Sequence, residues 1–266
     1  GNNASITSEF TFPKFIVPFR QNMFSKKTLP YTIFSLNYSL IQRINNYTII
    51  NATGSFGYSW KETNKKHWRL NPAFLTITKV PERLLSTTFK EKIDQNQYLR
   101  NIFSDNTIYG ENVTFDFKNN PDNLLRNNTT LRISFEEAGT LLRGVNYIYN
   151  KISQDNIQPI AQYIKLETDL RRYIRFKKSE WANRLMIGAG IPIGNTAVLP
   201  YIKRYSAGGA FSNRGWRART IGPGRSQDTT TNTSYIDRTG DMKFELNTEY
   251  RMNLLKLFSG VIVFKG

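Results

Sequence analysis

Residues 47–61 read Tyr-Thr-Ile-Ile-Asn-Ala-Thr-Gly-Ser-Phe-Gly-Tyr-Ser-Trp-Lys and alternate between two faces along their whole length. Aromatic side chains such as Phe56 and Tyr58 share one face. Small hydroxyl side chains such as Ser55 and Ser59 share the other. A period of two over about fourteen residues indicates a β-strand far longer than the usual 5–6 residues. A long hairpin in a soluble sandwich is the alternative, but the second face is too polar for a packed core.

The same alternation recurs along the chain at hairpin spacing. In 159–171 the apolar face, with Leu166 and Leu170, stands opposite a face that carries Lys165 and Asp169. One apolar face and one polar face with both charge signs are typical of a transmembrane β-barrel strand. The predicted strands are 5–12, 31–41, 47–61, 67–80, 107–117, 129–139, 159–171, 182–193, 241–250 and 257–264. The fold class predicted from them is all-β, an antiparallel transmembrane barrel.

The connections alternate between short and long. Asn45-Asn46 is a tight-turn signal, whereas 81–104 is long enough for one or two short helices. The longest connection, 194–240, lies between the predicted strands 182–193 and 241–250. Short turns on one side and long loops on the other are typical of the periplasmic and external ends of a barrel.

Composition limits the other classes. The chain of 266 residues carries a net charge of +17 and 14% aromatic residues, and it has no cysteine. Its Lys and Arg are scattered rather than gathered in one helix or tail, which weakens a nucleic-acid interpretation. No apolar run approaches the ~18 residues of a transmembrane helix, although barrel strands are only half hydrophobic and escape that test.

No catalytic, cofactor or metal motif stands out. His67 is the only histidine, so zinc sites and Ser-His-Asp triads lack residues, and the adjacent Glu136 and Glu137 point to opposite faces of a strand. Gly188-Ala-Gly-Ile-Pro-Ile-Gly194 has the wrong spacing for a dinucleotide loop. Small residues that let another segment pass close to a strand explain it better. We therefore expect no cofactor, no metal and no enzymatic activity.

The most specific segment is Leu199-Pro-Tyr-Ile-Lys-Arg-Tyr-Ser-Ala-Gly-Gly-Ala-Phe-Ser-Asn-Arg-Gly-Trp-Arg-Ala-Arg-Thr-Ile-Gly-Pro-Gly224. Paired glycines followed by an Arg-Gly-aromatic unit suggest a compact loop whose backbone approaches other backbone closely. The segment resembles the signature of the BamA/TamA superfamily of outer-membrane protein assembly factors. Its Pro-x-x-x-Arg-Tyr-x-Ala-Gly-Gly lead-in and Gly-Pro-Gly exit resemble the Bacteroidetes TamA-like branch. The weaker strand patterns extend the likeness over most of the chain.

The resemblance implies a site inside the barrel. A long loop in this family folds back into the lumen, and its tip arginine meets acidic side chains on the wall. The tip would be Arg214, with Glu249 as its first partner and Glu245 as its second. Both carboxylates share the lumen face of 243–251, opposite Phe244 and Leu246 on the lipid face, and a bidentate pair would fix the loop. The residues matched to the loop motif are Gly208, Gly209, Arg214, Gly215, Trp216, Arg217 and Gly222.

The sequence also departs from the family pattern. Lys265 stands near the place where the family's next strand carries an Asp. The resemblance implies periplasmic POTRA domains and further strands that this sequence does not contain. We therefore expect residues 1–266 to be a partial barrel domain, about ten of roughly sixteen strands, with 194–240 as the inserted loop.

The implied function is insertion or assembly of outer-membrane proteins, or polypeptide translocation, in the bacterial outer membrane. The implied partners are outer-membrane lipid, unfolded outer-membrane protein clients and POTRA domains, with accessory assembly subunits left open and nucleic acid not expected. Two alternatives remain at this stage. One is a passive porin-like channel, which single-channel conductance would identify. The other is a soluble basic nucleic-acid-binding β protein, which salt-dependent binding to DNA or RNA would identify.

Overall fold

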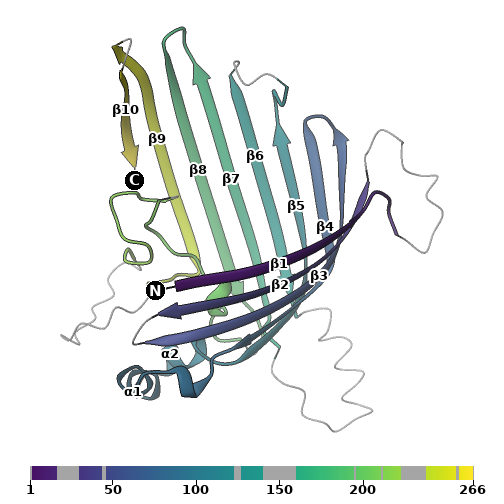
Figure 1. Cartoon of the computed structure of the whole chain (residues 1–266), viewed down its shortest axis with the longest axis vertical. Helices are drawn as coiled ribbons and strands as arrows, with labels where there is room; N and C mark the ends of the chain where they lie inside the picture. The colour runs from purple at the N-terminus through teal and green to yellow at the C-terminus, as the bar shows by residue number, and fades with distance from the viewer. Residues whose placement is uncertain are drawn as a thin grey trace.

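Ten antiparallel strands form one continuous curled sheet in the computed structural model (Figure 1). The structure describes residues 2–16, 30–43, 46–122, 127–139, 160–194, 196–210, 212–222, 238–255 and 258–265. Each strand pairs with its neighbour in sequence, in the order β1 to β10, so the sheet is a simple meander. Within the described residues it does not close, and β1 and β10 are its two edges.

The strands are long, as the period-two pattern predicts. Most span 11–17 residues, and β10 spans 8. They are β1 (Asn2–Phe12), β2 (Tyr31–Arg43), β3 (Tyr47–Thr63), β4 (Lys66–Lys79), β5 (Asn106–Lys118), β6 (Asn128–Ala138), β7 (Tyr163–Arg175), β8 (Ser179–Pro192), β9 (Met242–Leu255) and β10 (Phe258–Lys265). All ten predicted strands are confirmed. β9 runs past its predicted end to Leu255, and β7 begins late, at Tyr163, because Ile160 forms only an isolated bridge with Thr107.

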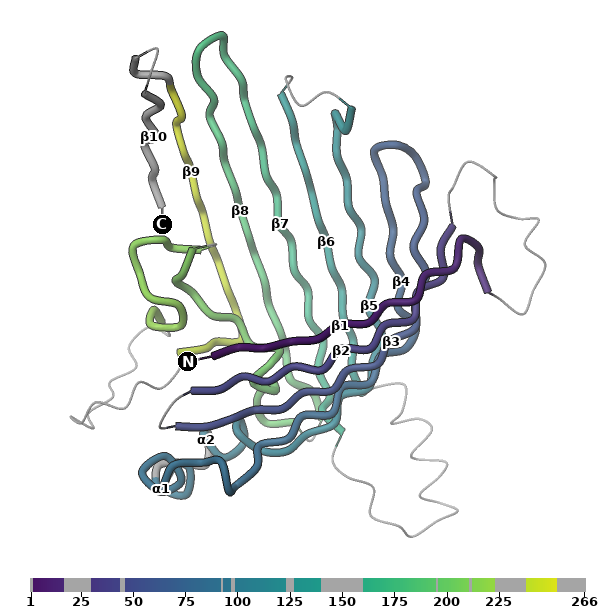
Figure 2. Tube along the Cα trace, viewed as in Figure 1, coloured from purple at the N-terminus to yellow at the C-terminus, as the bar shows by residue number. Residues whose placement is uncertain are grey.

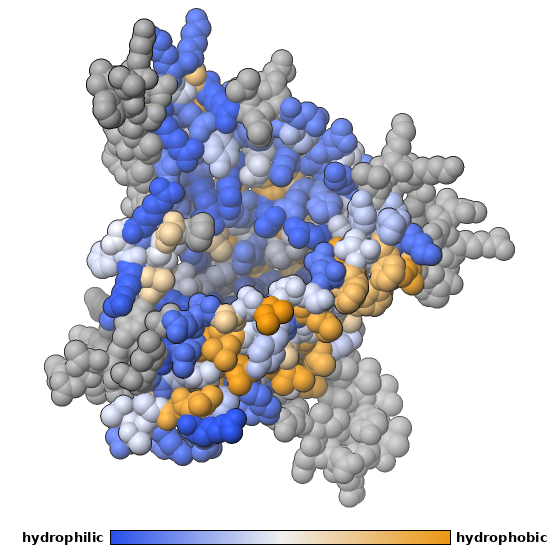
Figure 3. Space-filling model, in the orientation of Figure 1, coloured by the Kyte–Doolittle hydropathy of each residue, from blue (hydrophilic) through white to orange (hydrophobic). Residues whose placement is uncertain are grey.

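The two faces of the sheet differ as the alternation predicts. On the outer face Leu36, Tyr38 and Phe244 are exposed and apolar. On the inner face short polar side chains bond across the strands, as in the Ser35–Ser55 pair at 2.6 Å. In Figure 3 hydrophobic side chains gather over β1–β3, while hydrophilic ones cover the upper part of β5–β8. Apolar outside and polar inside is the pattern of a membrane barrel.

The two ends of the sheet carry different connections (Figure 2). One end has the short β3–β4 and β7–β8 turns together with the longer β1–β2 connection 13–30. The other end has the connections 80–105, 139–162 and 193–241 together with the short β2–β3 turn, so the predicted separation of short turns from long loops is only partial. The first of these long connections contains a 3-10 helix, η3 (Glu82–Leu84), and two helices, α1 (Thr87–Gln95) and α2 (Gln97–Ile102). This confirms the helices predicted in 81–104. In the described part of the chain, no helix has the length and apolar character needed to span a membrane.

A hydrophobic core lies at the long-loop end. Phe89 of α1 and Phe103 after α2 pack on Tyr47 of β3, and all three are buried. Tyr201 joins them from the 3-10 helix η4 (Tyr201–Lys203), which lies in the connection between β8 and β9. The core therefore joins three segments that are far apart in the sequence.

Candidate functional site

The long loop between β8 and β9 turns back over the inner face of the sheet. Leu199 and Tyr205 of this loop lie directly against Gly190 and Gly188 of β8. A Cβ atom added to Gly188 would be 2.5 Å from Cζ of Tyr205, and one added to Gly190 would be 2.5 Å from Cδ1 of Leu199. The small residues of 188–194 thus make room for a passing segment, which confirms the interpretation from the sequence.

The paired glycines close the loop on itself. Gly208 and Gly209 both have φ of +91°, a conformation that glycine adopts without strain. A Cβ at Gly208 would also lie 2.3 Å from the carbonyl oxygen of Arg217, so the two backbones meet there. The N–H of Gly209 donates to the carbonyl of Trp216 at 2.9 Å. The predicted close backbone approach is therefore present, and Gly222, at the described end of the motif, also has positive φ.

The Arg-Gly-Trp unit forms the exposed tip of the loop. Trp216 is 63% exposed, and a Cβ at Gly215 would meet nothing within 4 Å. Nε of Arg214 donates to the carbonyl of Ala210 at 3.4 Å, a bond within the loop. The carbonyl of Arg217 accepts a hydrogen bond from the Thr220 hydroxyl, which closes a turn after the Arg-Gly-Trp unit.

Glu245 of β9 fastens the loop to the sheet. The residue is 2% exposed, and its carboxylate accepts a 2.6 Å hydrogen bond from the Ser212 hydroxyl in the loop. Lys243 forms an ion pair with it at 2.8 Å and also donates to the carbonyl of Ser206 at 3.0 Å. Arg184 of β8 completes the group at 3.1 Å. One buried carboxylate thus links the loop to two strands.

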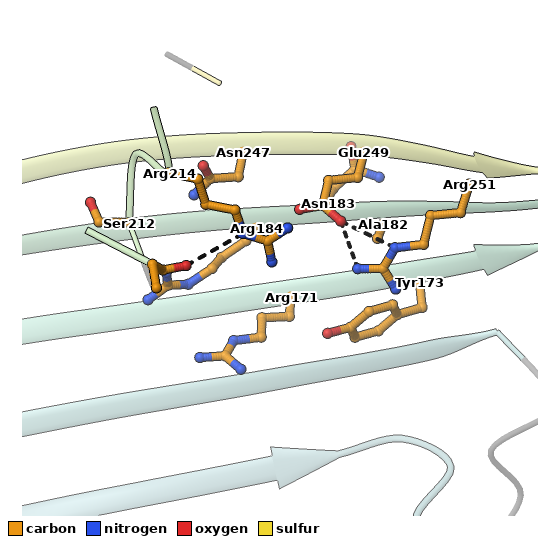
Figure 4. Close-up of a pocket in the computed structure, with 11 residues that line it drawn as sticks. Arg171, Tyr173, Ala182, Asn183, Arg184, Ser212, Arg214, Asn247, Glu249 and Arg251 are labelled. Atoms are coloured by element: carbon orange, nitrogen blue, oxygen red, sulfur yellow. Dashed lines mark hydrogen bonds and ion pairs between the residues drawn. The ribbon is translucent and has the colours of Figure 1, made fainter. Parts of the chain in front are cut away.

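Glu249 lies near the loop tip but has another partner. Its carboxylate pairs with Arg251 at 2.7 Å, and Arg251 also pairs with Glu180 of β8 at 2.9 Å. Arg214 and Glu249 line the same cavity (Figure 4), but the side chain of Arg214 bonds to Ala210 instead. Of the two predicted carboxylates, the structure brings Glu245 to the loop, through Ser212. A pair between Arg214 and Glu249 stays a prediction.

Tyr201 fastens the base of the loop. Its hydroxyl lies 2.8 Å from the Tyr47 hydroxyl on β3, and it accepts a hydrogen bond from Arg219. The Arg219 guanidinium also lies over the Tyr201 ring, 5.0 Å from its centroid. Arg219 has φ of 62°, the one positive φ among the described non-glycine residues. A strained backbone held by these contacts is typical of a functional segment.

Charged side chains form a ladder across the inner face. Asp169 of β7 bonds to Arg171 and to Arg184, each at 2.8 Å. Asp116 of β5 bonds to Arg132 of β6 at 2.6 Å and to Arg69 of β4 at 2.9 Å. This confirms the predicted polar face with both charge signs.

Several residues of the site escaped the sequence analysis. Ser212, Tyr201 and Tyr205 are common loop residues, and nothing in the local pattern marks them as anchors. Arg184 offered a weak signal, because it is a charge on the polar face of a predicted strand. In the described residues, no three His, Cys, Asp or Glu side chains lie close enough together to hold a metal ion.

The comparisons with known proteins agree with this architecture. A family model described as the Omp85 superfamily domain matches residues 2–265. The chain belongs to the Omp85 superfamily. This confirms the BamA/TamA-type resemblance at the level of the superfamily. Members of the Omp85 superfamily are bacterial outer-membrane proteins.

A solved structure shows the same fold. CdiB from Escherichia coli superposes with a TM-score of 0.53 at 13% sequence identity. The match covers 99% of this chain and 42% of CdiB, so the Omp85 chain spans less than half the length of that protein. A search of curated protein sequences gives no match.

Proposed function

We propose that this Omp85 chain is the barrel part of a factor that inserts or assembles outer-membrane proteins, or moves a polypeptide across the outer membrane. Superfamily membership supports the general class. The observation that carries the proposal is the loop that crosses the inner face and is held by Glu245. A barrel that only conducts solutes needs an open lumen, whereas a segment fixed inside the barrel suits a polypeptide-handling machine.

The loop is the proposed working element. In this proposal its Arg-Gly-Trp tip folds into the lumen and is held by carboxylates of β9. Glu245 acts through Ser212 and Lys243, and Glu249 exchanges Arg251 for Arg214, because Arg251 also has Glu180 as a partner. Ion pairs in a partly dehydrated lumen are stronger than pairs in open water. No covalent chemistry is involved, so the proposed protein is not an enzyme.

The proposed partners follow from the two ends of the sheet. Short turns of outer-membrane barrels face the periplasm and long loops face outward. The β3–β4 and β7–β8 turns would therefore face POTRA domains and unfolded clients in the periplasm. The outer face, with residues such as Leu36 and Phe244, would contact outer-membrane lipid.

The test uses the full-length protein reconstituted in lipid vesicles with an unfolded outer-membrane protein as client. We expect the vesicles to speed folding of the client, measured by its protease resistance, and to show low ion conductance. Arg214→Ala and Glu249→Ala should each lower the folding rate, and the double variant should be little worse than either single one. Vesicles that conduct ions steadily but leave the folding rate unchanged would establish the passive channel instead.

A further inference from the structure

A cavity of about 220 Å³ lies between strands β7–β9 and the tip of the long loop. Four guanidinium groups line it, three from the strands and one from the loop (Figure 4). They belong to Arg171, Arg184, Arg251 and Arg214. Among the described residues that line it, Glu249 is the only acid. The lining residues therefore carry more positive than negative charge.

Carboxylates on the wall pair with the three strand arginines. Arg251 bonds to Glu249 and Glu180, Arg171 bonds to Asp169, and Arg184 bonds to Asp169 and Glu245. Arg214 of the loop donates to the neutral carbonyl of Ala210 instead. An anion beside Arg214 would therefore gain a cation that these wall carboxylates leave over.

A second cavity of about 300 Å³ continues the first one along the wall. The two share Arg171 and Tyr173 as lining residues. The second cavity is lined by both charge signs, with Lys118 and Arg132 beside Asp116 and Asp169. Together the two cavities form an elongated polar lining, which suits an extended chain better than a single small ion.

Asn247 identifies the kind of ligand. It lines the first cavity, is 8% exposed, and its Oδ1 has no hydrogen-bond partner among the residues that the structure describes. Its Nδ2 donates to the Glu245 carboxylate at 2.7 Å, which fixes the free atom as the oxygen. A buried acceptor without a donor is costly and calls for an N–H group. Peptides offer backbone N–H groups and carboxylates together, whereas an inorganic anion such as sulfate offers no N–H donor.

We propose that this cavity binds an acidic segment of a polypeptide inside the barrel. Arg214 holds a carboxylate by its planar fork, and Oδ1 of Asn247 accepts a backbone N–H. The inference rests on the proposed function, in which the cargo is a polypeptide. It adds a chemical preference, because Asp- and Glu-containing segments are held beside the loop tip.

The test measures peptide binding by fluorescence anisotropy with the full-length protein in detergent. The probe is a labelled extended peptide containing Glu, and the matched peptide has Gln at the same positions. Arg214→Gln should weaken the Glu peptide about tenfold, the effect of one charge-assisted contact. Lys177→Gln is the control, because it removes one positive charge from the exposed β7–β8 turn outside both cavities.

The outcomes separate the explanations. Equal affinity for the Glu and Gln peptides, or equal losses in the two variants, would overturn the proposal. Displacement of the Glu peptide by inorganic phosphate at a matched charge concentration would show a general anion site and overturn the assignment to a peptide. Client folding measured in parallel keeps the two proposals distinct. Folding without peptide binding refutes only this inference, and peptide binding without folding refutes only the proposed function.

Discussion

Glu245 should contribute far more to the stability of the barrel than Glu249, although both lie on the inner face of β9. Glu245→Gln removes the charge that Lys243 and Arg184 share, and these cations are only 15% and 24% exposed. Breaking a buried ion pair typically costs about 3–5 kcal/mol. Here Arg184 keeps Asp169 and Lys243 keeps the Ser206 carbonyl, so we expect a loss of about 2–3 kcal/mol.

Glu249→Gln is the matched control. Its partner Arg251 is 42% exposed and keeps Glu180 at 2.9 Å after the change. The expected loss is that of an exposed pair, about 0–1 kcal/mol. Ser212→Ala should lose about 1.5–3 kcal/mol, because it removes a hydrogen bond to a charged group. Most of that loss should disappear in a Glu245→Gln background, since both changes remove the same contact.

The assay is urea unfolding of the reconstituted protein in lipid vesicles, followed by tryptophan fluorescence. Heat-modified mobility on gels gives an independent measure of the folded fraction. Equal losses for Glu245→Gln and Glu249→Gln would refute the reasoning, because they would mean that the loop contact adds nothing to the barrel. Strictly additive losses for Ser212→Ala and Glu245→Gln would refute it as well.

Three further predictions address the lipid face and the path of the loop. Phe56→Arg should destabilise the barrel in lipid by about 2–4 kcal/mol if the residue lies near the midplane, and Ser55→Arg on the inner face should cost less. Equal losses of unfolding free energy in urea titrations would contradict the assignment of faces. Gly188→Ala should lower the free energy of unfolding by about 1–3 kcal/mol, because the new methyl group would clash with the Tyr205 ring. Most of this loss should vanish in a Tyr205→Ala background, and an unchanged loss would show that the ring does not lie against Gly188. Tyr201→Phe removes the hydroxyl that contacts Tyr47 and Arg219, and it should weaken attachment of the loop by about 1–3 kcal/mol. We expect faster protease cleavage in the loop, and cleavage at the original rate would show that Tyr201 does not anchor it.

The strands and their faces were predictable because the period-two pattern is local. In 47–61 each residue's face follows from its neighbours alone, and the structure places Phe56 outside and Ser55 inside accordingly. The glycine pair at 208–209 was predictable for the same reason, since its backbone requirement is local. These features depend on no distant part of the chain.

The partners of the loop were not predictable to the same degree. Which carboxylate of β9 contacts the loop depends on the position along β9 at which the loop lies against the sheet. The position of the loop is set by Tyr205 against Gly188 of the preceding strand and by Tyr201 against Tyr47, which lies far away in the sequence. The sequence placed Glu245 and Glu249 on the right face, but only the path of the loop distinguishes them.

The contact between Tyr47 and Tyr201 also bears on the order in which the protein folds. The two residues are 154 positions apart, whereas every strand in the sheet pairs with its neighbour in sequence. Hairpins between neighbouring strands form early, because closing a short loop costs little entropy, while a contact across most of the chain must wait for the strands between its ends. Docking of the loop on the aromatic cluster should therefore be a late, slow step. Until it occurs, the nascent sheet keeps its inner wall uncovered, and a folding chain is most vulnerable to proteases in that interval.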